Sequence, residues 1–352
     1  MQLASLRHLS GAAFALAVLG ACAGDTPQSP GTPSAQPSDD ATVELAAYGG
    51  GDASHRRGCD AAEHRQFDFW LGKWTIVENG LDAGTNVIRR ALDGCAVMES
   101  YAADGFVGRS INSYDPATRQ WHQHWVDHVG TVLTLFGGID NGGMVLQGSR
   151  PLPSGGRIVD RITWTPLAQR QVRQHWVFST DDGATFPNTQ FDGLYTRVPA
   201  VSPDPEVPQE GCKDPTLPVL DELDYTLGRW EVSVAGLEGR TFRSRIRKEL
   251  SGCLIEERIE GAGGYEATAF TSVRRRLGIW ERTLVDNRGT NAFLTGTTTD
   301  GQLVLAGTAP SKRGKALDVR VTFTRKSDDR FVQRWERTND GGATWKRPFV
   351  VI

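Results

Sequence analysis

Three histidines carry the clearest chemical signal in this chain. His122 and His124 are separated by one residue, so on an extended strand their side chains point to the same face. His175 falls in a later extended segment and could join them. Three neutral imidazoles are a suitable ligand set for zinc, copper or iron. In the competing interpretation, His122 and His124 face solvent from a strand whose other face, with Trp121 and Trp125, packs inward.

The elements that would carry these residues occur twice. Phe67-Asp-Phe-Trp-Leu-Gly-Lys-Trp74 matches Leu223-Asp-Tyr-Thr-Leu-Gly-Arg-Trp230 in type and order. Later matches keep an offset of about 159 residues, as between Trp121 and Trp280. A period of this length is a whole domain rather than a solenoid unit or a propeller blade. The sequence therefore predicts a duplicated domain.

Each copy has the pattern of an antiparallel β protein. Segments that alternate in period two, such as residues 109–116, 120–126 and 131–136, are separated by turn residues. The chain holds 40 glycines and 10 tryptophans, which suits many turns around an aromatic core. Short helical segments are expected at residues 60–66 and 217–223, ahead of the first strand of each copy. We predict an all-β fold with two tandem antiparallel β-barrels.

The predicted boundaries follow from composition. Residues 56–198 form the first barrel and residues 212–352 the second. Residues 199–211 form a proline-rich linker between them. Residues 22–55 are rich in Pro, Ser, Gly, Ala and Asp and are predicted to be a flexible tether, and residues 1–21 a signal peptide.

Four of the five cysteines lie at matching places in the two copies. Cys59 and Cys95 fall in the first, and Cys212 and Cys253 in the second. The repeat favours the pairs Cys59–Cys95 and Cys212–Cys253, and four free buried thiols are the alternative.

Both copies begin their first strand with a Gly-x-Trp motif, at Gly72-Lys73-Trp74 and Gly228-Arg229-Trp230. This motif resembles the signature of the lipocalins and their calycin relatives, and the longer flanking blocks resemble bacterial lipocalin-like domains. The resemblance implies a lipocalin-like barrel in each copy. It also implies that Trp74 and Trp230 close the barrel floors, with Arg197 packed against Trp74.

The N-terminal segment resembles the signal of bacterial lipoproteins. A basic start and a short apolar run precede Leu19-Gly20-Ala21-Cys22, which is similar to a lipobox. The resemblance implies cleavage before Cys22, lipid attachment to its sulfur, and sorting to the outer membrane, because Ala23 rather than Asp follows. We therefore expect a lipid-anchored protein of the bacterial outer membrane that faces the periplasm.

No familiar catalytic motif accompanies these features. The chain lacks Gly-x-Ser-x-Gly, His-Glu-x-x-His, a P-loop and a dinucleotide fingerprint. The second copy places Glu281, Thr283 and Arg334 where the first has His122, His124 and His175, so the histidines are not part of the duplicated design. We predict no cofactor and no resident metal.

The leading functional hypothesis is binding of an apolar or amphipathic small molecule in a barrel cavity, with the three histidines as candidate ligand-binding residues. The alternatives are a structural or interaction module of the cell envelope with filled barrels, and a metal-dependent enzyme that uses His122, His124 and His175. A net charge of −3 gives no reason to expect nucleic acid as a partner. We expect a monomer.

Overall fold

The structure is a computed structural model that describes residues 59–152, 155–201, 211–212, 218–235, 239–274, 277–311 and 314–351. The predicted signal peptide, Cys22, the tether and most of the predicted linker lie outside these residues. Within the described part of the chain, no helix has the length and apolar character that crossing a membrane would need.

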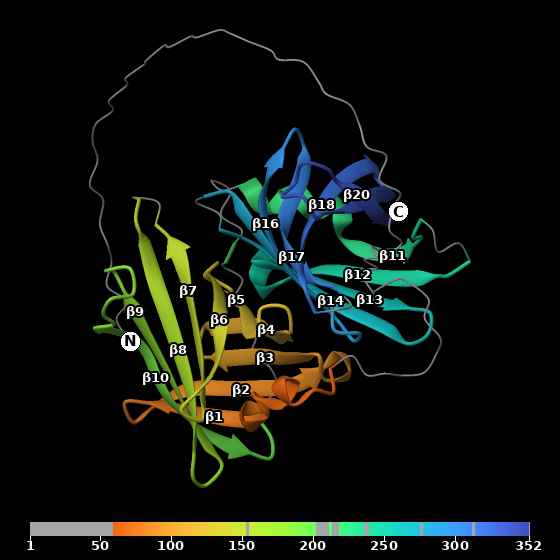
Figure 1. Ribbon diagram of the computed structural model, residues 1–352. Coiled ribbons are helices and arrows are strands. Elements are labelled where there is room, and N and C mark those ends of the chain that lie inside the picture. The colour runs from red at the N-terminus through yellow and green to blue at the C-terminus, as the bar shows by residue number, and fades with distance from the viewer. Residues whose placement is uncertain are drawn as a thin grey trace, which may run out of the picture. The chain divides into compact units, whose positions relative to one another are not determined.

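The first half of the chain forms one closed antiparallel barrel of ten strands (Figure 1). The strands are β1 (Gly72–Glu78), β2 (Leu81–Ala91), β3 (Ala96–Ala103), β4 (Phe106–Asp115), β5 (Gln120–Asp127), β6 (Val132–Asp140), β7 (Gly143–Pro151), β8 (Arg157–Leu167), β9 (Gln171–Ser179) and β10 (Asn188–Val198). Each strand pairs with the next in sequence, and β1 pairs with β10 to close the ring. The predicted strands at 109–116, 120–126 and 131–136 correspond to β4, β5 and β6.

In the described residues, the second half forms a curled antiparallel sheet of ten strands whose first and last strands do not pair with each other. The strands are β11 (Gly228–Val232), β12 (Phe242–Glu249), β13 (Leu254–Gly261), β14 (Tyr265–Arg274), β15 (Ile279–Asp286), β16 (Asn291–Thr299), β17 (Gln302–Pro310), β18 (Ala316–Ser327), β19 (Arg330–Thr338) and β20 (Lys346–Val351). The all-β, duplicated architecture is confirmed, but the second copy is a half-barrel.

The difference between the two sheets lies in their first and last strands. In the barrel, β1 has 7 residues and β10 has 11, and six residue pairs join them. In the second sheet β11 has 5 residues and β20 has 6, and each pairs with a single neighbour in the described part of the chain. The outer strands of the second sheet are therefore shorter than the two strands that form the seam of the first barrel.

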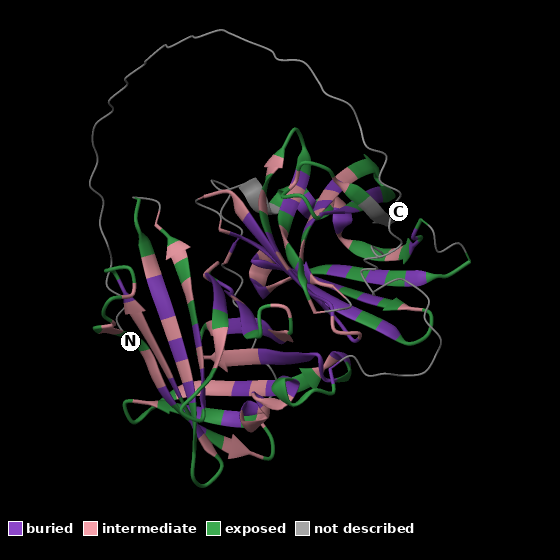
Figure 2. Ribbon diagram, viewed as in Figure 1, coloured by how far each residue is buried: buried purple, intermediate pink, exposed green. Residues whose placement is uncertain are grey.

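Burial alternates along the strands of both sheets, as the bands in Figure 2 show. In β12 the pattern is buried, exposed, buried, exposed over Phe242, Arg243, Ser244 and Arg245. This period of two is the one that a half-buried strand requires, since successive side chains point to opposite faces.

Short 3₁₀ helices precede the first strand of each half, where the sequence predicts helical segments. These are η1 (Ala62–Arg65) and η2 (Asp68–Trp70) in the first half and η4 (Pro218–Thr226) in the second. Phe67 and Trp70 stack at 4.7 Å between ring centroids, and both contact Trp164. The helical segments thus supply aromatic side chains that fill one part of the barrel interior.

The Gly-x-Trp tryptophans make similar contacts in the two halves. Trp74 donates through Nε1 to the carbonyl oxygen of Trp70 at 2.9 Å, and Trp230 donates to that of Thr226 at 2.7 Å. The Arg197 guanidinium lies 4.8 Å from the Trp74 ring centroid. Trp230 instead packs edge-on against Phe331 at 4.8 Å.

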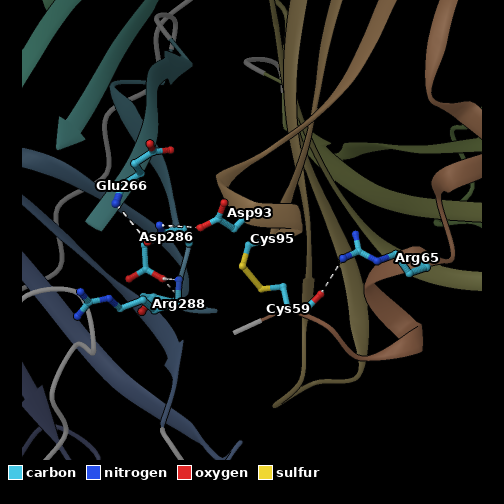
Figure 3. The surroundings of a disulfide bond; sticks show 9 residues. Cys59, Arg65, Asp93, Cys95, Glu266, Asp286 and Arg288 are labelled. Carbon is cyan, nitrogen blue, oxygen red and sulfur yellow. Dashed lines mark hydrogen bonds between the residues drawn. A yellow bond between two sulfur atoms is a disulfide. The ribbon is translucent and has the colours of Figure 1, made fainter. Parts of the chain in front are cut away.

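Two disulfides join Cys59 to Cys95 and Cys212 to Cys253, as the repeat predicts. Figure 3 shows the first of them beside Arg65, which donates to the carbonyl oxygen of Cys59 at 3.3 Å. Each bond closes a loop of tens of residues, with separations of 36 and 41 residues. Such a cross-link stabilises the fold mainly by restricting the unfolded chain.

Candidate functional site

The barrel of the first half contains a cavity of about 170 Å³. Its walls include aromatic side chains, three glutamines and two acids. The lining residues are Glu99, Tyr101, Phe106, Gln123, Trp125, Asp127, Leu133, Ile162, Trp164, Gln174, Trp176, Gln190, Phe191 and Tyr195.

Several of the lining aromatic side chains are only partly buried. Tyr101, Phe106, Trp125, Trp176 and Phe191 are half-buried, in contrast to the core residues that they pack against. Their ring faces therefore supply apolar surface that the protein itself leaves uncovered, and such surface is what an apolar ligand group would bury.

Trp125 owes its position to a glycine on the neighbouring strand. A Cβ atom at Gly108 would lie 2.2 Å from the Trp125 ring, closer than carbon atoms approach in proteins. Tyr101 also packs against Trp125, with ring centroids 6.2 Å apart. Gly108 thus provides the space in which the Trp125 indole forms one wall of the cavity.

Glu99 is the principal acid of the cavity. It lies on β3, and its side chain is 4% exposed. Ser110 donates to its Oε2 at 2.6 Å, and Asn86 donates to its Oε1 at 2.7 Å. Burial raises the pKa of the Glu99 carboxyl to about 7, while the two hydrogen bonds act in the opposite direction.

A hydrogen-bonded group of three side chains fixes the wall formed by β8, β9 and β10. Trp164 Nε1 and the Tyr195 hydroxyl both donate to Gln174 Oε1, at 2.9 and 2.7 Å. Burial, followed by the charge of Glu99, raises the pKa of Tyr195 well above its ordinary value. Tyr195 therefore stays a neutral hydrogen-bond donor, and the Gln174 amide is held in one orientation.

Asp127 lines the cavity but already has a structural role. One of its carboxylate oxygens accepts hydrogen bonds from the backbone N–H groups of Val129 and Thr131, at 3.1 and 2.8 Å. Asp286 makes the equivalent bonds to Arg288 and Thr290. Both acids cap the turn that follows their strand, which leaves Glu99 as the acid of the cavity without a turn to cap.

The second sheet repeats the acid but neutralises it. Glu257 occupies the position of Glu99, since each acid pairs with an isoleucine on one neighbouring strand, Ile246 and Ile88 respectively. Ser244 donates to Glu257 at 2.8 Å, and Arg282 forms a buried ion pair with it. A cavity of about 210 Å³ lies beside Glu257 and Trp230, so the second half is not solid either.

The structure places His122 and His124 on the outer face of the barrel rather than in the cavity, because Gln123 between them points inward. His124 lies 2.8 Å from Ser272 Oγ and 3.1 Å from Thr283 Oγ1, both in the second sheet. Neither histidine faces solvent, since their exposures are 3% and 0%. Burial lowers the pKa of each imidazole to about 3.

His175 does not join the other two. It is half-buried on β9, and strands β8, β7 and β6 lie between β9 and β5 in the sheet. His122 packs against the rings of Phe136 and Phe293, at 4.8 Å from each. In the described part of the chain, no group of three or more His, Cys, Asp or Glu side chains is placed to hold a metal ion.

Sequence reasoning missed Glu99 and Gln123 as cavity residues. A single acid in an apolar strand forms no motif, and the histidines on either side of Gln123 carry the stronger chemical signal. The repeat carried the signal, because the carboxylate is kept at Glu99 and Glu257 whereas Gln123 corresponds to Arg282.

Comparisons with known proteins leave the family open. No family model matches the chain, and a search of the curated proteins finds no match.

Proposed function

We propose that the first barrel binds an amphipathic small molecule, with an aromatic or other apolar part against the half-buried rings and a polar part beside Glu99. One observation carries the proposal: partly uncovered aromatic rings surround a buried carboxylate inside a closed barrel. Apolar walls with a few fixed polar groups are the usual composition of small-molecule sites. The resemblance to lipocalins supports the same function.

The first barrel is a better candidate than the second sheet. Its cavity is surrounded by a continuous ring of strands, whereas β11 and β20 leave the second sheet unclosed in the described residues. Its carboxylate is also held by two neutral donors, while Glu257 already has Arg282 as an ionic partner. We therefore assign ligand binding to the first half.

We further propose that the protein is a lipoprotein attached through Cys22 to the bacterial outer membrane, where it acts as a monomer in the periplasm. The lipobox-like Leu19-Gly20-Ala21-Cys22 supports this location. The two disulfides support it as well, since such bonds persist in oxidising compartments.

Isothermal titration of the full-length protein with indole, a neutral aromatic probe, tests the binding function. The blocking variant is Gln190→Trp, because Gln190 is exposed and also lines the cavity, which places it where the cavity meets solvent. The matched control is Thr189→Trp, at the adjacent exposed position, which does not line the cavity.

We expect indole to bind the wild type and Thr189→Trp equally, and to bind Gln190→Trp at least about tenfold more weakly, since the new ring occupies the site. Absence of heat with the wild type would contradict the proposal. Equal binding to all three proteins would place the indole site elsewhere and would also contradict it.

A further inference from the structure

Gln123 in the first barrel and Arg282 in the second sheet occupy equivalent positions, but only Arg282 carries a charge. Gln123 pairs with Asn112 and Leu135 on its neighbouring strands, and Arg282 pairs with Thr271 and Leu294. These registers make Gln123 and Arg282 structural equivalents. The first barrel therefore has a neutral, shorter side chain where the second sheet has a cation.

The surroundings of Arg282 show what a cation meets at this position. Its guanidinium donates to Glu257 and, at 2.7 Å, to the hydroxyl of Thr271. It also lies 5.4 Å from the ring centroid of Phe323, within the range of a cation–π contact. The second sheet thus builds a cation site from one acid, one polar side chain and one aromatic face.

The first barrel keeps the acid and the aromatic face of this set, with Asn112 in the place of Thr271. Glu99 stands for Glu257, and Trp164 stands for Phe323, since Trp164 pairs with Met144 as Phe323 pairs with Leu303. Both Glu99 and Trp164 line the cavity. The space that the guanidinium fills in the second sheet is accordingly part of the open cavity in the first.

The charges that line the cavity also favour a positively charged ligand group. Among the residues that the structure describes, its lining includes two acids, Glu99 and Asp127, and no Lys, Arg or His. Since Asp127 caps its own turn, Glu99 is the acid left for a ligand. A buried acid gains most from a partner that brings a positive charge and N–H donors together.

We propose that the ligand of the first barrel carries a cationic nitrogen, a protonated amine or an amidinium group, that binds between the Glu99 carboxylate and the Trp164 ring. This inference rests on the proposed function of the barrel and names its ligand class. The aromatic walls then take the apolar remainder of the molecule, so the ligand is an arylalkyl or similar amphipathic amine.

The electrostatics of Glu99 agree with this assignment. Burial holds the pKa of its carboxyl at about 7, so the empty site is partly protonated near neutral pH. A bound cation stabilises the carboxylate and displaces that proton. Binding of the amine should therefore release a proton below about pH 7, where Glu99 is protonated before the ligand arrives.

The test is isothermal titration of the full-length protein with three probes of the same shape: 2-phenylethylamine, 2-phenylethanol and phenylacetate. Indole serves as the reference for an intact cavity. The variants are Glu99→Gln, which removes the charge with little change in shape, and Gln123→Arg, which installs the cation of the second sheet. Glu63→Gln, at an exposed position, is the control for loss of one carboxylate.

We expect the amine to bind the wild type and Glu63→Gln about tenfold or more tightly than the alcohol, with the acid weakest. The preference should disappear in Glu99→Gln, and Gln123→Arg should bind none of the three. If Glu99→Gln does not fold, Gln123→Arg alone decides, because it keeps the acid and supplies its partner.

The outcomes separate this inference from the function on which it rests. Equal binding of amine and alcohol, with indole still bound, would overturn the cationic ligand and leave the binding function intact. Unchanged amine binding in Gln123→Arg would also overturn it. Failure of indole and all three probes to bind the wild type would overturn both.

Discussion

The Arg282 guanidinium forms a buried ion pair with Glu257 in the second sheet, at the two register positions that Gln123 and Glu99 occupy in the first barrel. Both members of the pair are only 3% exposed. The duplicated fold therefore presents the same buried acid in two states, one paired with an arginine of the chain and one held by neutral hydrogen-bond donors. This difference explains why only one half is expected to take a charged ligand.

Removal of the internal cation should destabilise the protein. Arg282→Gln leaves Glu257 buried without its ionic partner, and we expect a loss of about 3–5 kcal/mol in the free energy of unfolding. The double variant Arg282→Gln with Glu257→Gln should recover a large part of this loss, since no charge is then left uncompensated. Urea unfolding followed by tryptophan fluorescence measures both, and equal losses in the single and double variants would contradict the pairing.

Glu99 should make the protein less stable as the pH rises through a defined window. Its carboxyl has a pKa of about 7 in the folded protein and an ordinary value of 4.5, so between these values the folded state holds a proton that the unfolded chain releases. Stability from this group is present below pH 4.5 and is lost by about pH 7, with a total loss on the order of 3 kcal/mol.

The Glu99→Gln side chain cannot ionise, so the free energy of unfolding of this variant should not show the decrease that Glu99 causes between pH 4.5 and about pH 7. The comparison is the difference between variant and wild type across the window, obtained from urea unfolding at a series of pH values. A difference that stays constant with pH would show that the carboxyl is not perturbed in the folded protein.

His122 and His124 should make the protein less stable as the pH falls, the reverse of the effect of Glu99. Burial holds the pKa of each near 3, below the ordinary value of 6.5, so in acid the unfolded chain takes up protons that the folded protein does not. Stability is complete above pH 6.5 and is lost as the pH falls toward 3. At about pH 5 the expected loss is roughly 2 kcal/mol for each histidine.

His122→Phe tests the contribution of one of these two histidines to the loss of stability in acid. Neither ring nitrogen of His122 has a hydrogen-bond partner among the described residues, and its neighbours Phe136 and Phe293 are aromatic, so phenylalanine suits the site. We expect the variant to be more stable than the wild type at pH 5, measured by thermal unfolding. The control His175→Phe, at a half-buried position, should not give this gain in acid, and a variant less stable than wild type at every pH would refute the prediction.

Gly108 should be intolerant of any side chain. Gly108→Ala places a Cβ against the Trp125 ring, so the indole must move, and we expect weaker binding of indole by about tenfold. Gly138→Ala is the matched control, because the added Cβ at Gly138 meets no atom within 4 Å. Titration with indole measures the binding, and near-ultraviolet circular dichroism follows the Trp125 ring. Unchanged binding in Gly108→Ala would contradict the assignment of Trp125 to the cavity wall.

The sequence predicted the fold well because its signals are local and repeated. Period-two alternation located β4, β5 and β6, and the repeat selected both disulfide pairs. A barrel was predicted for each copy, and the first copy is closed whereas the second is a half-barrel. Closure depends on pairing between strands such as β1 and β10, more than a hundred residues apart, and alternation is the same in a barrel and in an open sheet.

The site could be predicted less well than the fold. Alternation fixes that His122 and His124 share a face but does not say what covers it, and here the second sheet supplies Ser272 and Thr283. Glu99 had no motif, because a buried acid is defined by its surroundings in three dimensions. Only a comparison of the two copies, position by position, would have shown Gln123 in the place of Arg282.

Native mass spectrometry of the full-length protein, purified gently from its own cells, tests the central claim most directly. A cavity walled by half-buried aromatic rings around Glu99 predicts a discrete noncovalent adduct of an amine-containing small molecule, reduced in Gln190→Trp and retained in Thr189→Trp. A bare polypeptide mass that also fails to gain 2-phenylethylamine on addition would contradict the claim that the first barrel is a binding site.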